Sequence, residues 1–216
     1  GLATALALAK RGATVVVLEA GRLVGEASGR NGGQCNAGTL QDYRSLVGSF
    51  GVERARRYYQ EFTAAVDSVE RLASEEHIDC DFNRRGKLKL ASKPTHFNKM
   101  VQTFEALQAD GVDPNVELVP PDCMRDEVGS NDYHGGLLQT TSAQLHVGKF
   151  GSGLAEAAAR RGVRLYASAP VTGLHRQSGG AWRITTPSGS VDAAQTLVAT
   201  GGSGSGPFGW FRRRII

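Results

Sequence analysis

The first 21 residues, GLATALALAKRGATVVVLEAG, constrain the fold of this chain more than any other stretch. Residues 2–11 are rich in alanine and leucine, which favour a helix that ends at Gly12. Residues 15–18 (VVVL) form a continuous apolar run, typical of a strand that helices cover on both faces of a parallel sheet. Helix, turn and buried strand in this order predict an α/β fold.

Gly1 and Glu19 lie at the two ends of this helix–strand unit. Unpaired N–H groups at a helix N-terminus attract phosphate, and an acid that closes the next strand accepts hydrogen bonds from ribose hydroxyls. The separation of Gly1 and Glu19 is close to the roughly 20 residues typical of such dinucleotide sites. Gly1, Glu19 and Ala20 are therefore predicted nucleotide contacts of a Rossmann-like domain. The alternative is that Glu19 ends a strand without a ligand.

A glycine-rich stretch at 25–34 (GEASGRNGGQ) follows the predicted strand. Glycines let backbone N–H groups approach an anion closely, and Ser28, Arg30 and Asn31 add side-chain donors. A flexible surface loop has a similar composition. The arginine, asparagine and glutamine beside four glycines favour a ligand-binding loop.

The rest of the chain alternates between helical and strand patterns. Helices are predicted at 52–76, 95–109 and 151–161, and strands at 86–91, 135–141 and 163–166. Strands at 170–177, 182–186 and 190–194 are predicted to form a meander, and TLVA at 196–199 is predicted to be a buried strand. The change of pattern between 79 and 145 indicates an inserted, mostly β domain.

Charge and composition argue against several functional classes. The formal net charge is +4, but three positive charges are consecutive at 212–214, so we expect no nucleic-acid partner. No apolar run reaches the roughly 18 residues of a membrane span. Three cysteines without a CxxC pair predict free thiols in a reducing, cytoplasmic compartment. The five histidines lack the spacing of a metal site, so no metal is expected.

These motifs resemble the amine-oxidising flavoprotein family of D-amino acid oxidases and dehydrogenases, sarcosine oxidases and glycine oxidases. The matching segments are residues 1–21, the loop at 25–34, HVGKFGSGLAEAAARRGVRLY and TLVATGG. The loop and the GPFGWFRRR ending bring the chain nearest to the bacterial γ-glutamylputrescine oxidoreductase branch. The resemblance implies an FAD cofactor and oxidation of a CH–NH bond in a small amine or amino acid.

The resemblance also implies roles for individual residues. Glu19 would bind the adenosine ribose of FAD, and Val171 would contact adenine through its backbone. The remaining contacts would be Ser28, Arg30 and Asn31 along the pyrophosphate and ribityl chain, Gly32, Gly33 and Gln34 near the isoalloxazine ring, and Thr200 and Gly201 beside the pyrophosphate. Domains would comprise an FAD-binding part at 1–78 and 146–216 and a partial substrate domain at 79–145.

No side chain is predicted to be the catalytic acid or base, because flavin accepts the hydride and the protein orients the reactants. Tyr133, His134 and His146 are candidate pocket residues, although packing or surface roles are favoured for them. Cys35 follows Gln34 and could anchor flavin covalently, as some relatives do. A buried, inert thiol is the favoured alternative.

The position of Gly1 predicts that the chain is an internal piece of a larger enzyme and lacks the first strand of its sheet. Such a strand buries about five apolar side chains at about 1.5–3 kcal/mol each. That sum is comparable to the stability of a typical domain, about 5–15 kcal/mol. We therefore expect the isolated chain to be unstable, inactive and weak in FAD binding. A nicotinamide-dependent dehydrogenase fragment and a non-catalytic remnant are the alternative interpretations.

Overall fold

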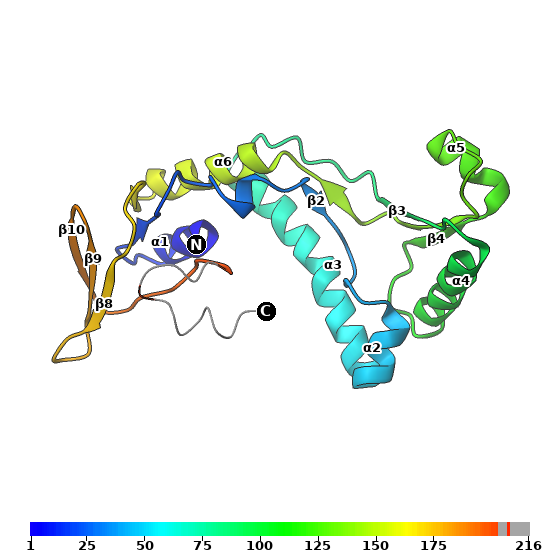
Figure 1. Ribbon diagram of the computed structural model, residues 1–216, viewed down its shortest axis with the longest axis horizontal. Coiled ribbons are helices and arrows are strands. Elements are labelled where there is room, and N and C mark those ends of the chain that lie inside the picture. Colours follow the sequence, from blue (N-terminus) through cyan, green and yellow to red (C-terminus); the bar gives the residue numbers. More distant parts are fainter. Residues whose placement is uncertain (203–206, 208–216) are drawn as a thin grey trace. The chain divides into compact units, whose positions relative to one another are not determined.

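The computed structural model describes residues 1–202 and 207 (Figure 1). The chain divides into two compact units. The first contains Gly1–Asn31 and the described part of Val147–Ile216, and the second contains Gly32–His146. The first unit is therefore built from two segments that are far apart in the sequence.

The first unit contains the predicted helix–strand pattern. Its elements are α1 (Leu2–Lys10), β1 (Val16–Leu18), the 3₁₀ turn η1 (Ala27–Gly29), α6 (Val147–Arg160) and β7 (Arg164–Tyr166). Strands β1 and β7 pair in parallel. Helices α1 and α6 pack together, and the small buried side chains Ala5, Ala157 and Ala158 allow a close approach. The parallel pair beside packed helices follows the pattern expected for this segment.

A three-stranded antiparallel meander completes the described part of the first unit (Figure 1). It consists of β8 (Gly173–Arg176), β9 (Trp182–Thr186) and β10 (Gly189–Ala193), in the order β8-β9-β10. Arg183 of β9 holds Asp192 of β10 through two hydrogen bonds, of 2.8 and 2.7 Å. The predicted meander is therefore confirmed.

The second unit combines long helices with short strands. Its elements are β2 (Gln34–Cys35), α2 (Tyr43–Phe50), α3 (Val52–Glu75), β3 (Lys87–Leu90), α4 (Pro94–Ala109), β4 (Val116–Val119), η2 (Pro121–Cys123), α5 (Met124–Val128), β5 (Gly136–Gln139) and β6 (Ala143–Gln144). Strands β3, β5 and β4 form an antiparallel sheet with β5 in the middle, and α4 packs against it. The core of this unit includes Tyr43, Tyr59, Met100, Leu107 and Leu137.

Several expectations from the sequence need correction. The first domain boundary lies at 31/32 and not at 78/79, because α3 packs on α2 and on the core of the second unit. The second boundary, at 146/147, lies one residue from the expected 145/146. The segment 79–145 is not mostly β, since it also contains the 16-residue helix α4. Helix α6 begins at Val147, earlier than the predicted residue 151.

The predicted strand at 196–199 is absent. A strand needs a neighbour that accepts its backbone hydrogen bonds, and no described strand pairs with these residues. Leu197 is 64% exposed in the structure. The mainly apolar residues 196–199 are therefore exposed in the part of the chain that the structure describes.

Candidate functional site

The N-terminus of α1 presents unpaired backbone donors. Gly1 is the N-cap of α1, and as a glycine it has no side chain that could accept a hydrogen bond from the first turn. The first N–H groups of an α-helix have no partner inside the helix, so they are free to bind an anion. A Cβ added to Gly1 would lie 3.7 Å from Cβ of Ala199, an ordinary contact, so the structure places residue 199 beside this helix end.

Glu19 directly follows β1, and its carboxylate is held by the local backbone. The Gly21 N–H donates to Glu19 Oε1 at 2.9 Å. The Glu19 N–H donates to the Tyr166 carbonyl, and its own carbonyl accepts from Ala169, so the backbone is fixed on both sides. Helix α1 packs on β1 and joins it through a short turn, so the helix start and Glu19 lie at the same end of this unit.

The glycine-rich loop contains a position that only glycine can occupy. A Cβ on Gly29 would lie 2.0 Å from the Val24 carbonyl oxygen, far inside van der Waals contact. Val24 itself has φ 58°, in the left-handed region that β-branched residues avoid. The loop is therefore held in a specific, strained conformation.

Helix α6 fixes this loop through a matching pair of residues. Gly151 is buried in α6, and a Cβ there would lie 2.3 Å from Cγ1 of Val24. The missing side chain of Gly151 leaves the space that the Val24 side chain fills. Packing against Val24 thus explains why residue 151, the first of the GSG stretch, is glycine.

The predicted side-chain donors of the loop interact mainly with the loop itself. Asn31 Nδ2 donates to the carbonyl oxygens of Ala27 (3.1 Å) and Ser28 (3.4 Å), and it closes the η1 turn. Arg30 lies 3.4 Å from Glu26 in a solvent-exposed ion pair. Exposed ion pairs are weak, so Arg30 can exchange its partner for an anionic ligand at little cost.

Gly32, Gly33 and Gln34 belong to the second unit, where they have different environments. Gly32 is exposed, and apart from its chain neighbours no atom of the described residues lies within 4 Å of an added Cβ. Gly33 is buried with φ 71°, and an added Cβ would lie 2.0 Å from the Leu145 carbonyl oxygen. Gln34 pairs with Gln144 in the short β2–β6 ladder. Strand pairing therefore explains Gly33 and Gln34, whereas Gly32 remains open to a ligand.

The last predicted contacts lie in the first unit outside regular strands. Val171 is half-buried and precedes β8 by two residues. Thr200 and Gly201 directly follow Ala199, the residue beside Gly1, and Gly201 has φ 58°. Thr200 and Gly201 therefore follow a residue that lies beside the start of α1 in space. Ala20 is exposed and directly follows Glu19.

The candidate pocket residues lie at two separate places in the second unit. Tyr133 and His134 precede β5, and the His134 N–H donates to the Ala91 carbonyl at 2.8 Å. His146 follows β6, and its backbone N–H donates to the Cys80 carbonyl at 2.7 Å. Cys35 is half-buried, and loss of hydration raises the pKa of its thiol, with a smaller opposite effect from Arg84. A raised pKa disfavours the reactive thiolate.

Sequence reasoning missed the residues that hold the segment just after the loop, at 37 and 38. Ser142, Gln139 and Tyr59 contact the backbone at Ala37 and Gly38, although they lie far away in the sequence. No described group of histidine, cysteine or acidic side chains has the geometry of a metal site. Among the described helices, none is long and apolar enough to cross a membrane.

The fold and the loop define a member of a flavoenzyme class. The chain belongs to the FAD dependent oxidoreductase family, whose model matches residues 1–214. It is 32% identical over 199 residues to gamma-glutamylputrescine oxidoreductase of Escherichia coli, and the alignment covers 92% of this chain and 46% of that protein. It is 26% identical over 200 residues to the probable oxidoreductase OrdL of Haemophilus influenzae, with 93% and 46% covered. The chain thus spans about half the length of these relatives.

Solved structures show the same fold. Glycine oxidase from Geobacillus kaustophilus aligns with a TM-score of 0.76 at 21% identity, covering 94% of this chain and 52% of that one. L-Amino acid deaminase from Proteus myxofaciens aligns with a TM-score of 0.75 at 18% identity, covering 94% and 43%. The expected fold class and the resemblance to the flavoprotein family are therefore confirmed.

The donor and acceptor groups fit FAD, the cofactor of this family. The uncapped start of α1 offers N–H donors to a pyrophosphate, and the fixed Glu19 carboxylate offers acceptors to a ribose. Both groups lie at the same end of the first unit. Bound FAD supplies a hydride acceptor, while the protein supplies binding and orientation.

Proposed function

We propose that the whole protein carrying this chain oxidises the CH–NH bond of a small amine or amino acid with FAD. The substrate loses a hydride to the cofactor and a proton to solvent or a base, and water hydrolyses the resulting imine. Support comes from the family match over residues 1–214 and from relatives named as a gamma-glutamylputrescine oxidoreductase and a glycine oxidase. We propose glutamylated amines and amino acids as the first substrates to test.

The observation that carries the proposal is the fixed carboxylate of Glu19 at the end of β1. With Oε1 held by the Gly21 N–H, the carboxylate is pre-oriented and loses little freedom when a ribose binds. We propose that Glu19 binds the adenosine ribose and that Gly1 and Ala20 lie beside it. Ser28, Arg30, Asn31, Thr200 and Gly201 would contact the pyrophosphate region, Val171 the adenine, and Gly32, Gly33 and Gln34 the ring region.

The proposal is tested with the purified whole protein. We expect a yellow chromophore that acid precipitation releases as free FAD, because Cys35 is proposed not to bond to flavin. The Glu19→Gln variant should bind FAD about 10- to 100-fold more weakly, since hydrogen bonds to charged groups contribute about 1.5–3 kcal/mol. Glu156→Gln is the matched control, because Glu156 is an exposed acid of α6. Unchanged affinity in Glu19→Gln would contradict this role.

The substrate class is tested by turnover of the same protein. A panel of polyamines, glutamylated amines and D-amino acids should contain at least one substrate that bleaches the flavin absorbance anaerobically. A colourless protein without turnover would instead support the non-catalytic remnant. Reduction by NADH alone, without bleaching by any amine, would favour nicotinamide chemistry.

We also propose that the protein works in a reducing compartment such as the cytoplasm. Its three cysteines are all free thiols, and Cys123 is exposed. An exposed free thiol is chemically stable only where disulfide formation is suppressed. Fractionation of the native cells tests this location.

A further inference from the structure

Residues 33–38, which comprise the end of the glycine-rich loop and the four residues after it, are held by a turn of the second unit. This turn, residues 139–142, joins β5 to β6. The Ala37 N–H donates to Ser142 Oγ at 2.9 Å. Ala37 is 1% exposed and Ser142 is 0% exposed, so water cannot replace the bond. The Ser142 hydroxyl therefore fixes the backbone of the segment at Ala37.

A second contact fixes the segment at Gly38. A Cβ on Gly38 would lie 2.8 Å from Gln139 Nε2 and 3.0 Å from the Tyr59 ring. Gln139 Nε2 donates to Tyr59 Oη at 2.7 Å, and Tyr59 Oη donates to Asp113 at 2.9 Å. All three side chains are buried. The network therefore forms a rigid surface against which Gly38 packs without space for a side chain.

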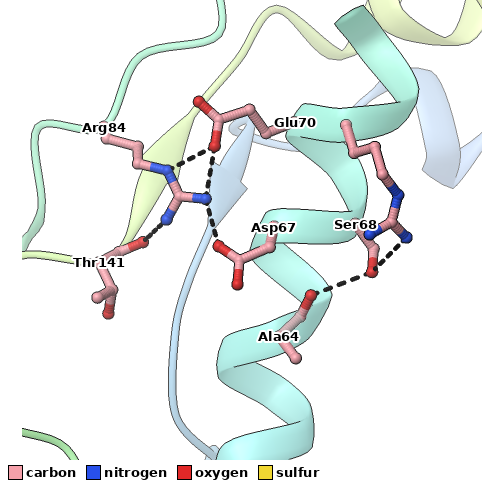
Figure 2. Close-up of polar contacts among 7 residues, drawn as sticks. Ala64, Asp67, Ser68, Glu70, Arg84 and Thr141 are labelled. Atoms are coloured by element: carbon pink, nitrogen blue, oxygen red, sulfur yellow. Dashed lines mark hydrogen bonds and ion pairs between the residues drawn. The ribbon is translucent and has the colours of Figure 1, made fainter. Parts of the chain in front are cut away.

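Arg84 also holds the turn at 139–142. Its guanidinium donates to the Thr141 carbonyl at 2.9 Å and bonds to Asp67 and Glu70 of α3 (Figure 2). Tyr59 also belongs to α3. One helix thus supports the turn through two independent connections, at Gln139 and at Thr141.

We infer that Ser142 and Tyr59 are positioning residues, which set how residues 32–34 lie against the ring of the bound flavin. This inference rests on the proposed function, in which Gly32, Gly33 and Gln34 contact the isoalloxazine ring. Gln34 and Gly33 are separated from Ala37 by only a few residues, and they are also bound by β6 and Leu145. Because β6 directly follows the turn at 139–142 and pairs with Gln34, a displacement of this turn would also move the backbone of Gly33 and Gln34.

Two pairs of variants of the whole FAD-loaded protein test the inference. Ser142→Ala removes the bond to Ala37, whereas Thr140→Val removes a hydroxyl of the same turn that bonds to Asn115 at 2.9 Å. Tyr59→Phe removes the network beside Gly38, whereas Tyr43→Phe removes a similar tyrosine–carboxylate bond, to Asp110 at 2.8 Å. The Thr140 and Tyr43 variants are the controls, since each removes a hydroxyl whose bonding partner lies outside residues 33–38.

The readouts are the visible flavin spectrum, its reduction potential and amide exchange at Ala37. We expect Ser142→Ala and Tyr59→Phe to shift the flavin absorption maximum and the potential, and to raise the FAD dissociation constant about 5- to 10-fold. Amide exchange at Ala37 should accelerate at least about tenfold in Ser142→Ala. Both controls should keep the wild-type spectrum and potential.

The outcomes separate this inference from the proposed function. A wild-type protein without flavin would overturn the proposed function itself. A wild-type holoprotein whose Ser142→Ala variant has faster Ala37 exchange but an unchanged spectrum and potential would overturn the positioning role alone. If Tyr59→Phe fails to fold, the Ser142→Ala and Thr140→Val pair decides the result.

Discussion

At the scale of single residues, the glycines of the loop have separate reasons for being glycine. Gly29 and Gly33 each face a carbonyl oxygen that an added Cβ would approach to 2.0 Å, whereas Gly32 is open. The sequence predicted a glycine-rich ligand loop because the composition is local information. It could not predict which glycines serve packing, since their neighbours Val24 and Leu145 are revealed only by the fold.

Gly29→Ala is expected to lower the free energy of unfolding by about 1–3 kcal/mol, the usual cost of forcing extra atoms into a packed site. The clash is with backbone at Val24, which cannot rotate away. Urea denaturation of the whole protein measures the change. In the matched control, Gly48→Ala on the exposed side of α2, stability should rise by about 0.5–1 kcal/mol. Equal stability of Gly29→Ala and wild type would contradict the assigned geometry.

The three thiols should react at different rates with a disulfide reagent. Cys123 is exposed, whereas loss of hydration raises the pKa of both Cys35 and Cys80. A raised pKa means less thiolate at a given pH, so Cys123 should react first at pH 8. The rate at Cys35 should keep rising with pH beyond the ordinary thiol range. Labelling followed by peptide mass analysis checks the order, and fastest labelling at Cys35 would contradict it.

At the scale of elements, the long and periodic segments and the strands of the meander were predicted well, whereas some short elements were missed. The helices at 52–76 and 95–109 appear as α3 and α4 within one residue at each end. Helix α2 and strand β4 were missed, because eight and four residues carry too little periodicity to stand out. The loop at 25–34 was proposed from its composition, whereas the contacts of Ser142 and Tyr59 with Ala37 and Gly38 depend on tertiary structure.

Arg84→Met should weaken the connection between α3 and the turn at 139–142. The side chain is 28% exposed and bonds to two carboxylates and a carbonyl (Figure 2). We expect a loss of about 1–2 kcal/mol in the free energy of unfolding, more than an exposed ion pair contributes. Arg183→Met is the control, since its pair with Asp192 is about half-exposed. If Arg84→Met loses no more free energy of unfolding than the control, Arg84 does not stabilise the connection between α3 and the turn.

At the scale of the whole molecule, the first unit is built from two segments that the second unit separates in the sequence. The sequence predicted the return of the α/β pattern near residue 146, because α6 and β7 have clear patterns. It assigned residues 32–78 to the first part because the pattern of short strands and turns begins only near residue 78. In the structure, α3 packs against α2 and the core around Tyr59, which places residues 32–78 in the second unit. The order of residues in the sequence does not reveal this packing.

FAD should stabilise the whole apoprotein against heat. At 100 times the dissociation constant, a ligand that binds only the folded state adds about 2.7 kcal/mol. For a protein of several hundred residues that corresponds to a rise of about 3–5 °C in Tm. FMN lacks the adenosine that Glu19 is proposed to bind, so its shift should be smaller, as should that of NADH. Scanning calorimetry with each ligand provides the comparison, and equal shifts for FAD and FMN would contradict the role of Glu19.

The contact between Val24 and Gly151 has an evolutionary consequence. The valine holds a left-handed backbone at a cost of about 1–3 kcal/mol, and its side chain occupies the space left by the glycine. A larger side chain at either position therefore requires a smaller one at the other. Lineages that lose the glycine at 151 are expected to carry glycine or alanine at 24, so the two sites should change together during descent.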